Sequence, residues 1–228
     1  MKYLAVIALI ITVNTYAKNN LSATRLSKLS GELSEPYDNK TKWDKRYSKR
    51  HYIYGKIPAR FLAENYSYLA KGSTVLDMGM GEGRNAVFLA QKGHKVTGID
   101  ISSVAVKKSR LLAKEYGVKI KTIVGTLEKY KIKQDSFDAI ICFYFVDRKL
   151  TQRMISWLKP GGVLIYEAHT TKEFDKKGSK TENIEFYLKA QELLSMFPSM
   201  SILKFEEPVH ESEFRSSIIL QKKKAVRK

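Results

Sequence analysis

The sequence predicts a doubly wound α/β domain built on a mostly parallel sheet. Apolar, β-branched runs alternate with amphipathic stretches over residues 74–169. The runs are apolar throughout, which is typical of strands covered by helices on both faces. A glycine-rich turn at residues 79–83 follows the first run. Two late runs, 201–207 and 216–223, are joined by a short acidic connection, which predicts an antiparallel pair at one edge of the sheet.

The expected elements follow in order along the chain. Residues 57–72 carry Pro58 near their start and Gly72 at their end. Their apolar side chains recur at helical spacing, which predicts an amphipathic helix. Five strands are then expected, over residues 74–79, 95–100, 118–124, 137–145 and 161–169. Four further helices are expected, over residues 84–93, 102–117, 147–159 and 183–197.

The two ends of the chain differ from the predicted domain. Residues 1–17 start with a lysine followed by a short apolar stretch, which is the layout of a signal peptide or N-terminal anchor. Residues 18–42 are polar and predict a linker or arm. We expect residues 43–222 to form the folded domain and residues 223–228 a basic tail. Any contact with a membrane is expected through the N-terminal segment.

The composition narrows the functional classes. The formal charge of +18 would attract nucleic acid, an anionic membrane or an anionic substrate, but it is equally consistent with a solvated surface. Because the lysines are not interleaved with aromatic residues, we do not expect a nucleic-acid platform. The single cysteine, Cys142, excludes an intramolecular disulfide and is expected to be a buried thiol. The four histidines are scattered, so we expect no metal site.

The glycine-rich turn predicts a ligand site. Gly79, Gly81 and Gly83 allow left-handed backbone angles and a close approach of the main chain to a ligand. The helix that follows offers unpaired N–H groups. In an open α/β sheet, ligands bind beyond the carboxyl ends of the strands. We therefore expect a ligand carboxylate or phosphate at this turn.

Two carboxylates narrow the choice of ligand. Asp77 precedes the turn, where it would repel a pyrophosphate, and the G-x-G-x-G spacing differs from that of dinucleotide sites. The same carboxylate would attract the amino group of a methionine-like ligand. Asp100 ends the next predicted strand, where it can accept both hydroxyls of a ribose. The alternative is that the glycines only make a tight turn and that Asp100 only caps the next helix.

These residues resemble the class I S-adenosylmethionine-dependent methyltransferases, and within them the branch of tellurite-resistance and thiopurine-type small-molecule methyltransferases. The resemblance lies in WDKRY (43–47), YIYGKIPARFL (52–62), VLDMGMGEGRNAVFLAQKGHKVTGIDIS (75–102) and LKPGGVLIYEAH (158–169). It implies a Rossmann-like methyltransferase fold with a seven-stranded sheet whose last strand is antiparallel. It also implies S-adenosyl-L-methionine as the cofactor. Because this cofactor is made in the cytoplasm, it conflicts with the signal-like N-terminal segment, and the localisation stays open.

The resemblance assigns the cofactor contacts residue by residue. Asp77 and the three glycines would surround the methionine part. Asp100 would bind the ribose, and Ile101 would lie beside the adenine. Where the family commonly has an acidic residue after the third strand, this chain has Thr126 and Leu127, so a threonine hydroxyl would replace the carboxylate.

The end of the fourth predicted strand bears on the acceptor. By the resemblance, Phe143 and Tyr144 would face the cavity of methyl transfer. Methylases of nucleobase amines usually carry Asn/Asp-Pro-Pro-Tyr/Phe there, and this chain does not. This departure disfavours methylation of a base.

Arg84 and His169 are the candidates for handling the acceptor. The sulfonium of the cofactor is already electrophilic, so the protein mainly has to align the acceptor in a dry pocket. A thiol or a selenium or tellurium oxyanion needs little base catalysis, whereas a hydroxyl or amine would want a base. His169 is placed to orient or deprotonate the acceptor, or is a surface histidine. Arg84 is placed to bind an anionic acceptor, or pairs with Glu82 or a helix carboxylate.

An aromatic segment precedes the glycine turn. Its members are candidates for a lid over the pocket, because aromatic faces favour a sulfonium methyl group. They are Trp43, Arg46, Tyr47, Tyr52 and Tyr54. The alternative is ordinary packing.

The sequence therefore predicts an enzyme that methylates a small molecule. Two alternatives stay open: a non-catalytic or exported binding protein that keeps the fold, and an RNA methyltransferase, which the net charge would suit. The sequence predicts no oligomeric state.

Overall fold

The computed structural model describes residues 39–173, 184–208 and 213–224. By its internal contacts the chain divides into two units, Met1–Trp43 and Asp44–Lys228. The described residues of the first unit, 39–43, are helical. The predicted signal peptide or anchor over residues 1–17 lies outside the described residues. The second unit holds the sheet, the helices and the candidate site.

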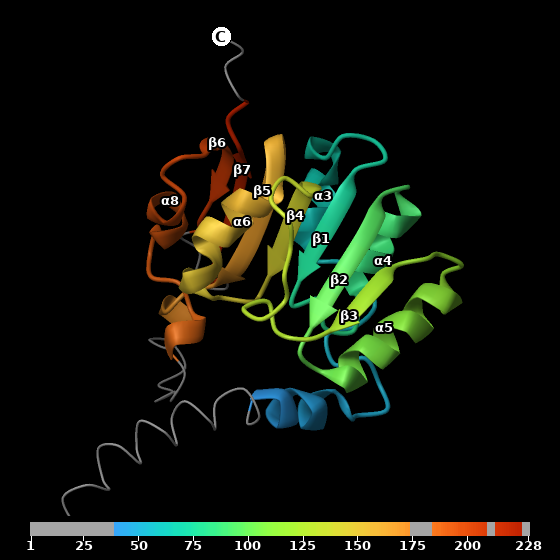
Figure 1. Ribbon diagram of the computed structural model, residues 1–228. Coiled ribbons are helices and arrows are strands. Elements are labelled where there is room, and N and C mark those ends of the chain that lie inside the picture. The colour runs from blue at the N-terminus through green and yellow to red at the C-terminus, as the bar shows by residue number, and fades with distance from the viewer. Residues whose placement is uncertain (1–38, 174–183, 209–212, 225–228) are drawn as a thin grey trace, which may run out of the picture. The chain divides into compact units, whose positions relative to one another are not determined.

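The second unit is built on a seven-stranded sheet in the order β3-β2-β1-β4-β5-β7-β6 (Figure 1). Neighbouring strands from β3 to β5 pair in parallel, whereas β7 pairs antiparallel with both β5 and β6. The predicted sheet, with its reversed last strand, is therefore confirmed. The strands are β1 (Thr74–Met78), β2 (Lys95–Asp100), β3 (Lys121–Val124), β4 (Phe137–Phe143), β5 (Leu158–His169), β6 (Ser201–Glu206) and β7 (Arg215–Gln221).

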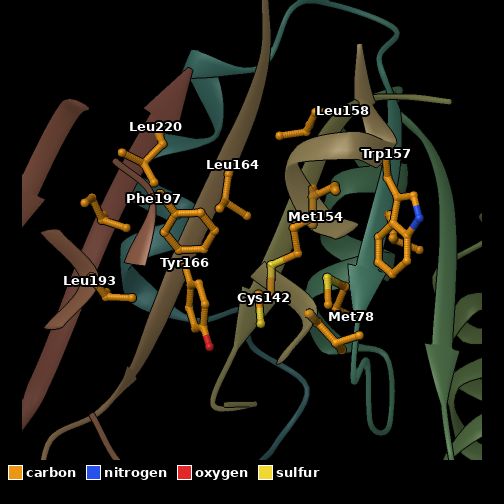
Figure 2. Close-up of a cluster of buried hydrophobic side chains, with 14 of the residues drawn as sticks. Met78, Cys142, Met154, Trp157, Leu158, Leu164, Tyr166, Leu193, Phe197 and Leu220 are labelled. Atoms are coloured by element: carbon orange, nitrogen blue, oxygen red, sulfur yellow. The ribbon is translucent and has the colours of Figure 1, made fainter. Parts of the chain in front are cut away.

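Helices cover both faces of this sheet. One face packs against α3 (Arg60–Asn65) and α4 (Arg84–Gln91), and α5 (Ser103–Glu115) packs against α4. The other face packs against α6 (Thr151–Trp157) and α8 (Glu192–Met196). Figure 2 shows this second core layer, in which Tyr166 of β5 packs edge-on to Phe197 after α8. The sheet is thus doubly wound, and the apolar character of its strands follows from burial on both sides.

Three predicted helices are shorter than their sequence patterns suggest. The expected helix over residues 147–159 starts with the 3-10 turn η2 (Arg148–Leu150), continues as α6 and ends at Trp157, because β5 begins at Leu158. The expected helix over residues 57–72 begins at Arg60, and it tightens into the 3-10 turn η1 (Tyr66–Tyr68). The side chain of Asn65 donates to the carbonyl of Phe61, inside the turn where the helix ends. The expected helix over residues 183–197 consists of a 3-10 turn, η3 (Ile184–Phe186), and of α8. Gln191 adopts a left-handed φ of 57° before α8, which separates the two.

Cys142 is fully buried in β4, as expected from its apolar neighbours. Burial raises the pKa of its thiol, and the sulfur lies 3.2 Å from the carbonyl oxygen of Phe145. The hydroxyl of Tyr166 donates to the same carbonyl at 2.8 Å. These contacts fix the backbone just beyond β4, where the site begins.

Within the described ranges, none of the helices is both long and apolar enough to cross a membrane.

Asp138 clamps β1 to β4 at the end of the sheet opposite the glycine turn. One carboxylate oxygen accepts from the amide and the hydroxyl of Thr74, at 2.8 and 2.6 Å, and the other accepts from Lys159 at 2.7 Å. Partial burial opposes ionisation, but the hydrogen bonds from Lys159 and Thr74 outweigh it and lower the pKa of Asp138 to about 2.

We expect Asp138→Asn to lower the free energy of unfolding near neutral pH by about 1 kcal/mol, a modest value because the side chain is partly exposed. The folded-state pKa lies below the ordinary value of 3.8, so the stabilisation is present above that value and is lost as the pH falls toward about 2. Urea unfolding of both proteins from about pH 7 to about pH 3 measures this. A stability difference that does not shrink on acidification would contradict it.

Candidate active site

The candidate site lies at the carboxyl ends of β1, β2 and β4. The strand order reverses between β1 and β4, because the chain runs outward from β1 to β3 and returns to add β4 on the other side. Ligands of open α/β sheets bind at such a reversal. The glycine turn, Asp77 and Asp100 all lie there, so the structure brings together the groups that the sequence singled out.

The glycines of the turn are required by their backbone angles and neighbours. Gly79, Gly81 and Gly83 have φ values of 63°, 55° and 87°, all left-handed, and Gly83 caps α4. A Cβ on Gly83 would lie 2.6 Å from Cβ of Ser109 in α5. Farther back, a Cβ on Gly98 of β2 would overlap the side chain of Met80, so this glycine makes room for the turn to pack on the sheet.

Asp100 ties the turn to the start of α5. Its two carboxylate oxygens accept from the amide of Gly81 and from the amide of Ser102, each at 2.8 Å. Burial raises the pKa of Asp100, and these two hydrogen bonds act in the opposite direction. The N-cap of α5 is Ser102, whose hydroxyl accepts from Ala105. Asp100 is therefore more than a helix cap, and each of its oxygens still has a lone pair for a ligand hydroxyl.

Asp77 is almost fully buried, and its Oδ2 has no hydrogen-bond partner among the described residues. Burial, and then the nearby carboxylate of Asp100, raise the pKa of Asp77 to about 8, although Arg84 and the amide of Ala86 lower it. A buried oxygen without a partner costs free energy. A ligand amino group would supply both the missing donor and a positive charge, so this position fits the methionine end of the expected cofactor.

The residues expected around the adenine follow two neighbouring strands: Ile101 follows β2, and Thr126 and Leu127 follow β3. The amide of Gly125 donates to the carbonyl of Asp100 at 2.9 Å, which holds this loop beside the ribose position. Ile101 is partly buried, whereas Leu127 is buried in the core on the α6 face. The hydroxyl of Thr126 is buried, with no hydrogen-bond partner among the described residues. It is therefore available to a ligand.

Phe143, expected at the cavity, is buried at the end of β4 within the core on the α3–α4 face. Phe145, which sequence reasoning missed, lies against the glycine turn instead. A Cβ on Gly79 would be 3.1 Å from its Cβ and Cγ atoms. The backbone changes direction between Phe143 and Phe145, at Tyr144, whose φ of 59° is left-handed. A local sequence pattern does not reveal such a reversal.

Arg84 does not pair with Glu82, which corrects one alternative from the sequence. Its guanidinium donates to the carbonyl of Tyr54 at 3.2 Å and lies 5.6 Å from the ring centroid of Tyr144. Glu82 instead pairs with Lys108 of α5 at 2.7 Å. The charge of Arg84 thus lies beside Tyr144, which the resemblance placed at the cavity of methyl transfer.

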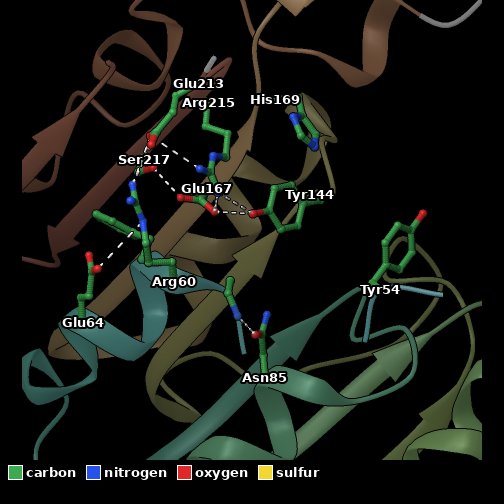
Figure 3. Close-up of polar contacts among 12 residues, drawn as sticks. Tyr54, Arg60, Glu64, Asn85, Tyr144, Glu167, His169, Glu213, Arg215 and Ser217 are labelled. Carbon is green, nitrogen blue, oxygen red and sulfur yellow. Dashed lines mark hydrogen bonds and ion pairs between the residues drawn. The ribbon is translucent and has the colours of Figure 1, made fainter. Parts of the chain in front are cut away.

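His169 lies beside Tyr144, with ring centroids 4.9 Å apart (Figure 3). The ring centroid of Tyr187 lies 6.2 Å from that of His169. The Nδ1 atom of His169 lies 3.0 Å from a carboxylate oxygen of Glu173. A carboxylate at this distance helps to orient the imidazole ring. No sequence motif pointed to Glu173. Its position four residues after His169 is the only local feature that connects the two.

A buried carboxylate holds Tyr144 in its unusual conformation. Figure 3 shows Glu167 of β5 between Tyr144, Ser217 and Arg215. Glu167 accepts from the Tyr144 hydroxyl at 2.6 Å and from the Ser217 hydroxyl at 2.8 Å, and Arg215 lies 3.9 Å away. Because β7 supplies Ser217 and Arg215, the reversed strand helps to hold Glu167 and, through it, Tyr144.

The expected aromatic lid divides in the structure. Tyr47 is buried, and its hydroxyl would lie 2.9 Å from a Cβ on Gly81. Tyr54 contacts Tyr47 edge-on, and its hydroxyl accepts from Arg46 at 2.8 Å. Tyr52 points toward α5 instead, where its hydroxyl donates to the carbonyl of Lys108. Trp43 belongs to the first unit, so its expected place in the lid stays a prediction.

Across the described ranges, no cluster of three or more His, Cys, Asp or Glu side chains is arranged to hold a metal ion.

Comparisons with known proteins show what the chain is similar to in sequence. Residues 75–162 match the family model described as a methyltransferase domain. The chain is 35% identical over 99 residues to a ubiquinone biosynthesis O-methyltransferase of Xanthomonas axonopodis pv. citri (strain 306), a match covering 41% of each chain. It is 28% identical over 156 residues to the protein of the same name from Idiomarina loihiensis, covering 65% of this chain and 61% of that protein. The chain thus spans less than two thirds of the length of these curated relatives.

Solved structures share the fold at low identity. One, from a study of the conversion of a disulfide bond into a thioacetal group in echinomycin biosynthesis, has a TM-score of 0.66 and 18% identity, and covers 82% of this chain and 93% of its own. A methyltransferase of Methanosarcina mazei, described as S-adenosylmethionine-dependent, has a TM-score of 0.54 and 22% identity, and covers 70% of this chain and 96% of its own. These structures show that the chain shares the Rossmann-like fold of methyltransferases, and residues 75–162 are similar to a methyltransferase domain.

Proposed function

We propose that this protein transfers the methyl group of S-adenosylmethionine to a small molecule. The observation that carries the proposal is the pair of buried carboxylates at the glycine turn. Asp77 has an oxygen without a hydrogen-bond partner in the part of the chain that the structure describes, and Asp100 holds the turn through the amide of Gly81. Asp77 would bind the amino group of the cofactor, and Asp100 the ribose hydroxyls. Bound there, the cofactor supplies an activated methyl group.

The remaining cofactor contacts follow from the neighbouring strand ends. The Thr126 hydroxyl would donate to or accept from the adenine, with Ile101 beside it, whereas Leu127 packs in the core behind this position. The left-handed turn at Gly79, Gly81 and Gly83 would let backbone groups approach the ligand carboxylate. Phe145 would exclude water near Gly79.

The acceptor side favours a hydroxyl group. His169 with Glu173 forms a pair able to take a proton, and a hydroxyl acceptor needs such a base. The O-methyltransferase relatives point the same way. The resemblance to tellurite-resistance and thiopurine-type enzymes favours a soft nucleophile, which would need no base. Arg84, held beside Tyr144, would attract a negatively charged acceptor of either class.

Asp100→Ala should weaken S-adenosylmethionine binding by about a hundredfold, because two hydrogen bonds to a charged group are lost and the turn loses its anchor. Calorimetric titration measures the affinity. Asp135→Asn is the matched control, because its carboxylate pairs with Lys222 at the other end of the sheet. Unchanged affinity in Asp100→Ala would remove Asp100 from the site.

Cofactor affinity should rise with pH up to about pH 8. In the free protein the pKa of Asp77 is raised to about 8, so below that pH a cationic amino group must displace a proton. The affinity should therefore increase by up to about tenfold per pH unit and then level off. Titration in buffers of different ionisation enthalpy should show proton release at neutral pH. The Asp77→Asn variant should bind S-adenosylmethionine weakly, and its affinity should not rise with pH. A flat wild-type profile would contradict the assignment.

A panel of acceptors should separate the acceptor classes. We expect release of S-adenosylhomocysteine with an anionic hydroxyl compound, and His169→Ala should lower this turnover by about a hundredfold while leaving cofactor affinity unchanged. Turnover of a thiol or chalcogen oxyanion should not depend on His169. Turnover of soft acceptors alone would favour the thiopurine-type activity. Salt-sensitive methylation of RNA alone would contradict the small-molecule proposal.

A further inference from the structure

A strap formed by residues 44–54 crosses the glycine turn and is tied to it through a buried ion pair. Glu82 lies in the turn itself, between Gly81 and Gly83. Its side chain is 3% exposed, and that of Lys108 in α5 is 14% exposed. Neither residue is needed for the cofactor contacts assigned above. Their burial therefore calls for another role.

The amino group of Lys108 and both carboxylate oxygens of Glu82 form hydrogen bonds. Lysine has three N–H donors. Those of Lys108 face the carbonyls of Lys49 and His51, at 2.6 and 2.8 Å, and Glu82 Oε1, at 2.7 Å. The second oxygen of Glu82 accepts from the amide of Ile53 at 2.7 Å. The pair therefore holds three backbone groups of the strap and fixes its distance from the turn.

Two further contacts hold the strap. At its start, Asp44 accepts from the Ser102 hydroxyl at 2.6 Å and from the amide of Val104 at 3.2 Å, at the beginning of α5. Tyr47 lies against Gly81, where burial and then the carboxylate of Asp100 raise the pKa of its phenol. The strap thus covers the turn and the position expected for the ribose.

We infer that Glu82 and Lys108 are positioning residues that keep the strap closed over the bound cofactor and thereby set how fast the cofactor and its product leave. The inference rests on the proposed function, since it places S-adenosylmethionine at this turn. Removing one partner leaves the other charge buried and unpaired, so the strap should open. Because changes at an existing site act mainly on dissociation, the effect should appear in the off-rate.

The test uses the full chain and two independent readouts. In Lys108→Met, dissociation of S-adenosylhomocysteine, followed by stopped-flow displacement, should be about tenfold faster than in the wild type. Glu82→Gln keeps an acceptor for the Ile53 amide and should show a smaller increase. Lys107→Met, an exposed neighbour on the same helix, is the matched control and should leave the rate unchanged.

Trypsin provides the second readout, because the strap carries Lys45, Arg46, Lys49 and Arg50. Cleavage there, identified by mass spectrometry, should be faster in Lys108→Met than in Lys107→Met, and S-adenosylhomocysteine should slow it in the wild type. A lower melting temperature in Lys108→Met with unchanged cleavage and unchanged dissociation would overturn the inference. If the wild type binds neither ligand, the proposed function fails instead, and the difference in cleavage without ligand still tests whether the pair holds the strap.

Discussion

Asp100 connects three segments around the site, two through its carboxylate and one through its backbone carbonyl. Its oxygens bind the amides of Gly81 and Ser102, and its backbone carbonyl binds the amide of Gly125. A buried charge needs such donors, because without them its desolvation would not be offset. One residue at the end of β2 therefore fixes the glycine turn, the start of α5 and the loop after β3. The positions proposed for the ribose and the adenine depend on this arrangement.

The two sides of the site differ in charge. The cofactor side holds two nearby carboxylates, and the free protein lowers their repulsion by keeping a proton on Asp77 near neutral pH. The side proposed for the acceptor presents the positive charge of Arg84 against the ring of Tyr144. A cationic cofactor and an anionic acceptor would thus each meet the opposite charge. This separation brings the two reactants together without requiring either carboxylate to contact the acceptor.

The sequence was sufficient where structure depends on local patterns. Strand periodicity, the glycine turn and the acidic strand ends predicted the sheet and the location of Asp77 and Asp100. The sequence did not predict contacts between residues that lie far apart in the chain. Glu82 selects Lys108, 26 residues away, over the nearby Arg84. Phe145 reaches the turn because Tyr144 reverses the backbone, held by Glu167 of β5. Such pairings depend on tertiary packing, which no local spacing encodes.

The contact between β2 and the glycine turn has a consequence for how related sequences vary. Gly98 has no side chain, and Met80 fills the volume that a Cβ there would occupy. The two positions share one space, and a close-packed interior does not accommodate both side chains. Homologues with a larger residue at the position of Gly98 should therefore carry a smaller one at that of Met80. Covariation of these two positions would then report on the packing of the turn, without indicating which acceptor is methylated.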